Sequence, residues 1–489
     1  MSILVDAREL TDDNKTNIYE CLMFKRKPKK KMRGKFIPGP PVKFYMKESE
    51  FQAISEASSQ AKDRSVIVPG EDIKEDSNSK EKTSNENLYR IPFSFANVIT
   101  GSYKNAKLER PDIALEFRGK LRDHQVPVVE RAMRYLKDYC STTLGLYTGF
   151  GKTVTAAYLS CHLKKRICIL YPATALGPQW EKVFKDNTNC STWLVGESKE
   201  KTSKPPSSYI PDVIICLDER WQKIPEYLRD MVGTLVVDEA HMFCTETAVP
   251  CILAFRPQYL IQCTATPTRE DELHLMLWSL GGMHIIYTIY DRPFVVMKIN
   301  TGIRPSSKMK GPDFHWSEYE HSILMNKDRN RIIMSIVRGD IGEHKVAALS
   351  TRKDHVKELY DISTQAGIPC DFMMGTKKGY KDSNFLIGSF SKIGVGFDEA
   401  NFCKDYGGTP IDTIMVVGTV RSVSRLEQGV GRAFRAESPR IYHFVDEGKV
   451  FESQWKDVVP WYKQRKCIII EYRVAFAGKS IFLEEMKRC

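Results

Sequence analysis

The alternation of apolar and helix-like segments constrains the fold of this 489-residue chain most strongly. Short β-rich runs such as LGLY, RICILYP, DVIICL, TLVVDEA and QYLIQCTATP are separated by helix-like stretches. After a break near residues 300 to 320, the alternation resumes with KVAALS, NFLIGSF, DTIMVVG and RIYHFV. Near-continuous apolar strands separated by helices are typical of a parallel sheet covered on both faces. The two blocks therefore predict two tandem α/β domains, each built on a doubly wound parallel sheet.

The segments outside the two blocks differ from them in composition. Residues 25–35, KRKPKKKMRGK, hold eight basic side chains in eleven within a chain of net charge +12. Such an arm could neutralise phosphates, or it could be a solvated tail or an import signal. From about Met46 to Asn87 the chain is rich in Glu, Ser, Lys and Asn, which favours a flexible linker or surface insertion. We expect an extension over 1–90, a first domain over 91–298, a linker over 299–318, a second domain over 319–446, and a C-terminal helix and strand over 447–489.

Hydropathy and cysteine usage favour a soluble protein of a reducing compartment. No apolar run reaches the length of about 18 residues that a membrane span requires. The thirteen cysteines are scattered, never form a Cys-x-x-Cys pair, and often sit inside apolar runs, as expected of buried thiols. We expect a cytoplasmic monomer that does not bind membranes, with a nuclear location as the alternative.

The stretch LYTGFGKTVTA, residues 146–156, predicts a phosphate-binding loop between a strand and a helix. Glycines at 149 and 151 allow successive backbone N–H groups to converge on phosphate oxygens at the start of the helix. Lys152 would then reach the β- and γ-phosphates, and the Thr153 hydroxyl would serve Mg²⁺. Leu146 replaces the first glycine of the general G-x-x-x-x-G-K-[ST] pattern. A glycine turn that merely caps a helix is the alternative.

A second element, TLVVDEAH at residues 234–241, is an apolar strand that ends in two consecutive carboxylates. Where a strand ends the chain bends, so both side chains can reach one site. We expect Asp238 to hold the shell of Mg²⁺, and Glu239 to orient and deprotonate an attacking water. An acidic pair that caps a following helix is the alternative.

Four stretches in this order resemble motifs I, II, III and VI of the superfamily 2 helicases, the DEAH-box nucleic-acid-dependent ATPases: TGFGKT, VVDEAH, CTATPTRED and RLEQGVGRAFR. Weaker matches are LRDHQ, ILYPATAL, ALSTRKDHVKEL and FSKIGVGFDEA, and the set covers residues 119 to about 445. LRDHQ, TATPTRED and LSTRKDH look most like the duplex-DNA translocases of transcription and repair. The arrangement also resembles helicases of large cytoplasmic DNA viruses, such as iridoviruses, and their poxvirus transcript-release relatives.

The resemblance implies a role for each residue that matches a motif. The residues implied to bind ATP are Gln125, Thr148, Gly149, Phe150, Gly151, Lys152, Thr153, Asp398 and Gln428. Those implied to act in catalysis or to hold the metal are Lys152, Glu239, Arg432, Arg435, Thr153 and Asp238. Those implied to couple the nucleotide state to domain movement are His241, Thr264, Ala265 and Thr266. Those implied to contact nucleic acid are Pro172, Thr174, Thr351, Arg352 and Gly396.

The spacing within RLEQGVGRAFR adds a geometric expectation. Gln428, Arg432 and Arg435 are four and three residues apart, which places all three on one face of a helix. A guanidinium that enters the phosphate site from a second domain stabilises the charge developed in phosphoryl transfer, and its loss typically costs about 10³ to 10⁵ in rate. A surface cluster of arginines is the alternative. Relatives often have a threonine where the strand DVIICL ends, but Cys216 and Leu217 stand there.

These features predict an ATP-dependent DNA helicase or duplex-DNA translocase that uses ATP and Mg²⁺. An RNA helicase, or a nucleic-acid-binding scaffold with a vestigial ATPase, are the alternatives. The partners implied are nucleic acid and RNA polymerase or other transcription factors. The viral resemblance implies work in the host-cell cytoplasm or the virion.

Overall fold

The computed structural model describes residues 2–25, 31–32, 35–36, 41–60, 87–100, 110–196, 209–269, 271–306, 315–394, 396–478 and 480–488. Most of the basic arm at 25–35 and of the low-complexity segment lies outside these residues. The chain divides into two compact units. The first comprises Met1–Leu146 and Phe150–Tyr287, and the second comprises Tyr147–Gly149 and Thr288–Cys489.

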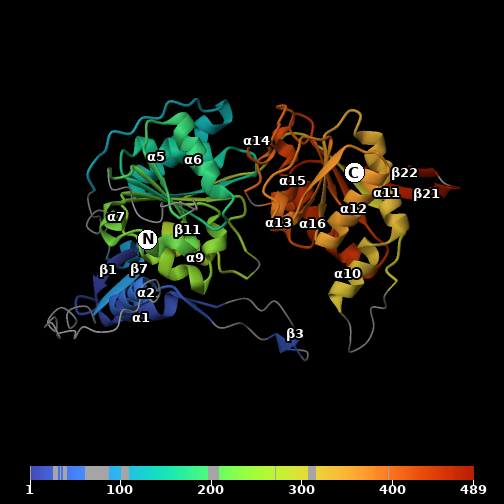
Figure 1. The fold of residues 1–489 in the computed structure, drawn as a ribbon. Coiled ribbons are helices and arrows are strands. Elements are labelled where there is room, and N and C mark those ends of the chain that lie inside the picture. The colour runs from blue at the N-terminus through green and yellow to red at the C-terminus, as the bar shows by residue number, and fades with distance from the viewer. Residues whose placement is uncertain are drawn as a thin grey trace, which may run out of the picture. The chain divides into compact units, whose positions relative to one another are not determined.

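The first unit is built on a seven-stranded sheet with the order β10-β11-β9-β12-β13-β8-β14 (Figure 1). The adjacent strands from β10 to β8 pair in parallel, and every residue of β8, β9, β11 and β12 is buried. Figure 1 shows the helices α5 and α6 on one side of this sheet and α9 on the other. The bounds are β8 Ser141–Leu146, β9 Ile167–Tyr171, β10 Thr192–Leu194, β11 Val213–Leu217, β12 Thr234–Val237, β13 Tyr259–Thr264, β14 Ile285–Thr288, α4 Val126–Tyr139, α5 Lys152–His162, α6 Leu176–Asn187, α7 Glu226–Met231, α8 Val249–Leu253 and α9 Leu275–Gly281.

The N-terminal residues belong to the first unit. Strand β1 (Ser2–Asp6) pairs antiparallel with β7 (Leu88–Pro92), which also pairs with β6 (Met46–Lys47). Helix α2 (Glu48–Gln60) follows β6, so the prediction of a flexible linker from about Met46 is wrong for this helix. The reason is one aromatic side chain in a polar segment: Phe51 is buried and stacks on the ring of Trp221 at 5.5 Å.

The second unit is built on an eight-stranded sheet with the order β17-β18-β16-β19-β20-β15-β21-β22. All neighbours pair in parallel except the last two, which form an antiparallel hairpin. The two large parallel sheets confirm the predicted fold class. The bounds are β15 Val295–Asn300, β16 Val346–Ser350, β17 Cys370–Met373, β18 Phe385–Ser389, β19 Thr413–Val416, β20 Arg440–Val445, β21 Ile468–Ala477, β22 Ser480–Arg488, α10 Trp316–Leu324, α11 Lys327–Asp340, α12 Lys353–Gln365, α15 Val423–Val430 and α16 Lys449–Gln464.

The first domain was expected to extend to residue 298, but the main segment of the second unit already begins at Thr288. Strand β15 lies between β20 and β21 and pairs with both of them in parallel, so its apolar residues belong to the second core. The C-terminal segment supplies one helix and two strands, where one strand was expected. Within the described part of the chain, no helix has the length and hydropathy needed to cross a bilayer.

Candidate active site

The predicted phosphate loop follows β8 and has the backbone conformation that its glycines allow. Gly149 and Gly151 have φ of +96° and +99°, in the left-handed region that favours glycine. A Cβ at Gly151 would lie 2.6 Å from Nε2 of Gln125, so a larger residue would clash there. Helix α5 begins at the next residue, Lys152. The N-terminal end of a helix therefore follows two adaptable glycines, as anion binding requires.

Gln125 is held against this loop by three hydrogen bonds. Its Nε2 donates to the carbonyl of Gly151 at 3.2 Å and to Oγ1 of Thr155 at 3.1 Å. Its Oε1 accepts from the Arg122 backbone N–H at 2.8 Å. The structure thus brings together Gln125 and Gly151, two of the residues implied to bind ATP.

Lys152 and Phe150 have defined partners in the first unit. The Lys152 amine donates to the Leu146 carbonyl at 3.1 Å, so it points back across the loop. Phe150 is buried, and its carbonyl lies 3.1 Å from Nε2 of His124. The two rings also meet edge to face at 4.8 Å. His124 was not identified from the sequence, although it lies within the LRDHQ stretch.

The two carboxylates follow β12 at the edge of the sheet where β8 also ends. Strand β13 lies between β12 and β8 and is parallel to both. Glu239 has φ of +47°, an uncommon conformation for a residue with a side chain. Such outliers often occur at functional sites. The bend turns the chain directly after Asp238, as expected from the strand-end argument.

Asp238 is buried and fixed by two donors. Its Oδ2 accepts from the Trp180 indole N–H at 2.8 Å, and its Oδ1 accepts from the Glu239 backbone N–H at 2.9 Å. Burial, and then the nearby charge of Glu239, raise the pKa of Asp238 to about 6, against the opposing effects of Trp180 and Lys152. Trp180 was not identified from the sequence, because nothing in its local pattern distinguishes it from an ordinary core residue of α6.

The oxygens at this site fit a hydrated Mg²⁺ ion and an attacking water. Oε2 of Glu239 is buried and has no hydrogen-bond partner among the described residues. A buried polar atom without a partner is costly, so this oxygen is suited to accept a proton from a bound water. Mg²⁺ keeps several waters and binds through few carboxylates, which fits Asp238 together with the hydroxyl of Thr153.

A chain of hydrogen bonds runs from His241, whose Nδ1 lies 3.5 Å from Oε2 of Glu239, to the loop after β13. Nδ1 of His241 lies 2.9 Å from Oγ1 of Thr264, which also accepts from the Thr266 backbone N–H at 3.0 Å. Burial, and then the charges of Arg269 and Lys152, lower the pKa of His241 to about 4, so its ring is neutral at pH 7. The structure thus brings His241, Thr264 and Thr266 together, and Ala265 between them is buried.

Arg269 completes this chain and was not identified from the sequence. One of its guanidinium nitrogens donates to the His241 carbonyl at 2.6 Å, and two others bind the Asp271 carboxylate at 2.8 Å each. Both residues lie in the quoted TATPTRED stretch, so a charged pair within motif III was the available signal.

The motif VI arginines lie in the second unit, and the expected single helical face is wrong. Helix α15 ends at Val430 and is capped by Gly431. Arg432 precedes a short 3₁₀ turn over Ala433–Arg435. The α-helical repeat on which the prediction rested ends at Val430, and the two arginines take different environments.

Arg432 is buried and binds backbone oxygens. Its guanidinium donates to the carbonyls of Phe397, at 2.6 Å, and Gly394, and its Nε donates to the Gln428 carbonyl at 3.2 Å. Arg435 instead pairs with Asp398 at 3.2 Å, with 29% of its side chain exposed. The structure therefore brings Asp398, Gln428 and both arginines together.

The residues implied to contact nucleic acid fall in two places. Thr174 is exposed and Pro172 half-buried after β9, just before α6. In the second unit, Thr351 donates to the buried carboxylate of Glu320 on α10 at 2.8 Å, a partner that the sequence did not indicate. Arg352 binds Asp354 at 2.9 Å and the Ser317 hydroxyl at 2.8 Å. Gly396 has φ of +68°, and Cys216 is buried within β11.

Comparisons with known proteins place these motifs among helicases. Residues 118–269 match the family described as "Type III restriction enzyme, res subunit". The chain is 31% identical to "Putative helicase 109L" of Invertebrate iridescent virus 3, over 46% of this chain and 72% of that protein. It is 25% identical to "Putative helicase 161L" of Invertebrate iridescent virus 6, over 85% of this chain and 97% of that protein. It is 26% identical to "Transcript termination protein A18" of Fowlpox virus, over 74% of this chain and 81% of that protein.

Proposed function

The chain belongs to the superfamily 2 helicases of large DNA viruses, and we propose that it couples the hydrolysis of Mg·ATP to movement along duplex DNA. The observation that carries the ATPase part is the acidic pair at the edge of the first sheet. Asp238 is held by Trp180, and Oε2 of Glu239, which accepts no hydrogen bond from the described residues, lies at the same edge as the end of β8, where the phosphate loop begins.

The side chains of the first unit divide the chemistry between them. Lys152 leaves the Leu146 carbonyl and binds β- and γ-phosphate oxygens, and Gln125 recognises the adenine. Glu239 takes a proton from the water as its oxygen attacks the γ-phosphorus and the bond to the β-phosphate breaks, which releases ADP and phosphate. The Mg²⁺ ion, held through Asp238 and Thr153, neutralises phosphate charge when bound.

The His241–Thr264–Thr266 chain provides the coupling. Because His241 is neutral and lies 3.5 Å from Glu239, a proton or water gained by Glu239 changes the environment of the ring. The hydrogen bond to Thr264 passes that change to the loop after β13. A contiguous network of this kind is able to bias the conformation of a mobile element.

In the second unit, we assign different roles to the two motif VI arginines. Arg435 is the candidate for the guanidinium that stabilises the transition state, because an exchangeable, partly exposed ion pair with Asp398 is easily broken. Arg432 is a positioning residue, because its guanidinium already joins the carbonyls of Gly394 and Phe397 to motif VI.

Duplex DNA is supported as the track by the likeness of LRDHQ, TATPTRED and LSTRKDH to the duplex-DNA translocases. Thr351 and Arg352 are engaged by side chains of their own unit, which leaves backbone amides to grip phosphates without regard to sequence. The name of the fowlpox relative, a transcript termination protein, supports a role in transcription, with RNA polymerase as a partner in the infected-cell cytoplasm or the virion.

The test is ATP turnover measured without nucleic acid and with single-stranded and duplex DNA and RNA. We expect duplex DNA to give the largest stimulation.

Glu239→Gln should lower kcat by about 10² to 10⁴ with ATP binding retained, because only the proton acceptor is lost. Lys152→Ala should lose ATP binding, and Lys182→Ala, an exposed position on α6, is the control. Turnover that no nucleic acid stimulates would overturn the translocase, and stimulation by RNA alone would change its track.

A further inference from the structure

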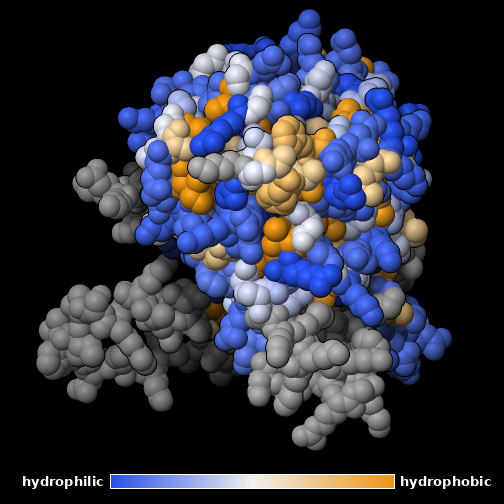
Figure 2. Space-filling view, turned by 90° about the vertical axis from the view of Figure 1, so that its right-hand side faces the viewer, coloured by the Kyte–Doolittle hydropathy of each residue, from blue (hydrophilic) through white to orange (hydrophobic). Residues whose placement is uncertain are grey.

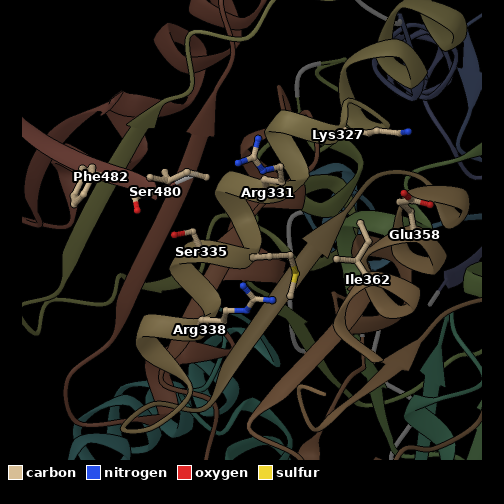
Figure 3. Close-up of a pocket in the computed structure, with 10 residues that line it drawn as sticks. Lys327, Arg331, Ser335, Arg338, Glu358, Ile362, Ser480 and Phe482 are labelled. Atoms are coloured by element: carbon tan, nitrogen blue, oxygen red, sulfur yellow. The ribbon is translucent and has the colours of Figure 1, made fainter. Parts of the chain in front are cut away.

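The second unit carries a groove of about 750 Å³ that uses none of the residues assigned to ATP or nucleic acid. Figure 3 shows Arg331, Ser335 and Arg338 along α11, between residues of α12 on one side and of β22 on the other. The groove therefore has the outer face of α11 as its floor and two walls of different secondary structure.

The floor of the groove is cationic. Lys327, Arg331 and Arg338 line it from α11, and all three are exposed. Arg331 forms an ion pair with Asp328 at 3.1 Å. Lys327 and Arg338 have no ion-pair partner among the described residues. Glu358 contributes the one carboxylate among the residues that line the groove. The groove thus carries an excess of positive charge along about three turns of helix.

Each wall of the groove carries apolar side chains, beside Glu358 on α12 and Ser480 on β22. Ile362 of α12 and Ile481 and Phe482 of β22 line it, and Phe482 is 53% exposed. Strand β22 is the last strand of its sheet. Figure 2 shows apolar side chains gathered on the face it presents, framed by hydrophilic ones. Exposed apolar side chains rimmed by charge are typical of sites that bind other proteins.

We propose that this groove binds an acidic peptide segment of a partner protein, with carboxylates over α11 and an apolar side chain against Ile362 and Phe482. The mixture of three cations with apolar walls is complementary to such a segment. A nucleic-acid strand fits less well, because its continuous phosphates would meet Glu358 in the groove and the exposed Glu484 and Glu485 further along β22.

The test uses the full chain and the fluorescence anisotropy of a labelled peptide of about ten residues that alternates Asp and Glu with Leu and Phe. A second peptide has Ser at the apolar positions. We expect the first peptide to bind and the second to bind at least about tenfold more weakly, because only the first fills the apolar walls. Arg338→Glu should weaken the first peptide by at least about tenfold, and Phe482→Ala by about the same.

Matched variants separate the groove from general surface effects. Lys357→Glu changes an exposed charge of α12 that does not line the groove, and Phe476→Ala removes an exposed ring outside it. Both should bind the peptide within about twofold of the unchanged protein. All four variants should retain ATP turnover, which checks that they fold and keeps this test independent of the ATPase.

Three results would overturn the proposal. One is the absence of binding by the apolar acidic peptide, and another is equal weakening by the groove and control variants. The third is displacement of the peptide by a thymidine oligonucleotide whose own binding is lost in Arg338→Glu, because the groove would then be a nucleic-acid site.

Discussion

Asp238 and Glu239 are adjacent in sequence but differ in the hydrogen bonds that their carboxylate oxygens accept. Both oxygens of Asp238 accept hydrogen bonds, whereas one oxygen of Glu239 is buried without such a partner. The sequence predicted the two roles from the position of the residues at a strand end. It could not predict the indole that fixes Asp238, because Trp180 comes from a helix far away along the chain.

The raised pKa of Asp238 predicts an acid limb in the activity profile. Its carboxylate must be ionised to hold Mg²⁺, and its pKa is about 6 rather than the usual value near 4. We therefore expect kcat/KM for ATP to fall as the pH drops through about 6, approaching tenfold per pH unit. More Mg²⁺ should move the limb to lower pH, because the metal competes with the proton.

The matched variant for this pH effect is Glu239→Gln. Because its turnover is low, the pH dependence is measured through the binding of Mg·nucleotide. Removing the Glu239 charge removes the second largest cause of the shift, so the midpoint should move below that of the unchanged protein. A binding profile that is flat from pH 8 to 5 in both proteins would contradict the role of Asp238.

Asp238 and His241, both buried, affect stability in opposite directions. Because the folded-state pKa of Asp238 is raised, its ionisation weakens the folded state above about pH 6, and stability is gained as the pH falls toward 4. Because the folded-state pKa of His241 is lowered to about 4, stability is lost as the pH falls from about 6.5 to 4.

Gly151 is the residue at which the phosphate loop tolerates least change. Its φ of +99° is unfavourable for a side chain, and a Cβ would meet the Gln125 amide at 2.6 Å. Gly151→Ala should cost about 1 to 3 kcal/mol of stability and weaken ATP binding through displacement of Gln125. Thermal unfolding with and without nucleotide measures both, and Gly342→Ala, where a Cβ meets nothing within 4 Å, is the control. Equal effects of the two variants would contradict the packing argument.

At the scale of elements, the strands were the most predictable feature. The strands ICILY and VAALS are almost entirely apolar, and such a run requires a strand buried on both faces. Helix α2 was missed because its sequence is mostly polar, and a single buried ring, Phe51, anchors it. The early start of the second unit was missed because a strand that crosses to another sheet looks locally like any other strand.

Motif VI shows where spacing alone fails. The interval between Gln428 and Arg432 suits a helix, but α15 ends at Val430, before the arginines. Arg432 binds the carbonyls of Gly394 and Phe397, while Arg435 pairs with the side chain of Asp398. A contact with distant backbone oxygens leaves no mark in the local sequence, so only the structure separates the two residues.

This difference predicts separable effects for the two arginines. Arg432→Ala should lower the thermal unfolding midpoint by several degrees, because two buried carbonyls lose a charged donor at about 1.5 to 3 kcal/mol each. Arg435→Ala should change stability by less than about 1 kcal/mol but lower kcat by about 10³ or more. Calorimetry and ATP turnover on the same samples test both. Loss of stability in Arg435→Ala, or full turnover in it, would contradict these roles.

At the scale of the whole molecule, the chain contains the parts that a nucleic-acid motor requires in two separate sheets. The phosphate loop, the acidic pair and the His241–Thr264 chain belong to the first sheet and its loops, and motifs IV, V and VI to the second. The order of motifs along the sequence predicted this division and the family. The choice between DNA and RNA depends on loop contacts with phosphates. Because such contacts are independent of base sequence, few residue patterns in the chain indicate them.

The most direct test of the central claim is displacement of a triplex-forming strand from duplex DNA, because a translocase removes that strand without having to separate the duplex. We expect displacement that requires ATP and Mg²⁺, is absent in Glu239→Gln, and depends on a duplex track on one side of the triplex. If the protein hydrolyses ATP rapidly on this DNA and the third strand stays bound, ATP hydrolysis is not coupled to movement along the duplex and the proposed function is wrong.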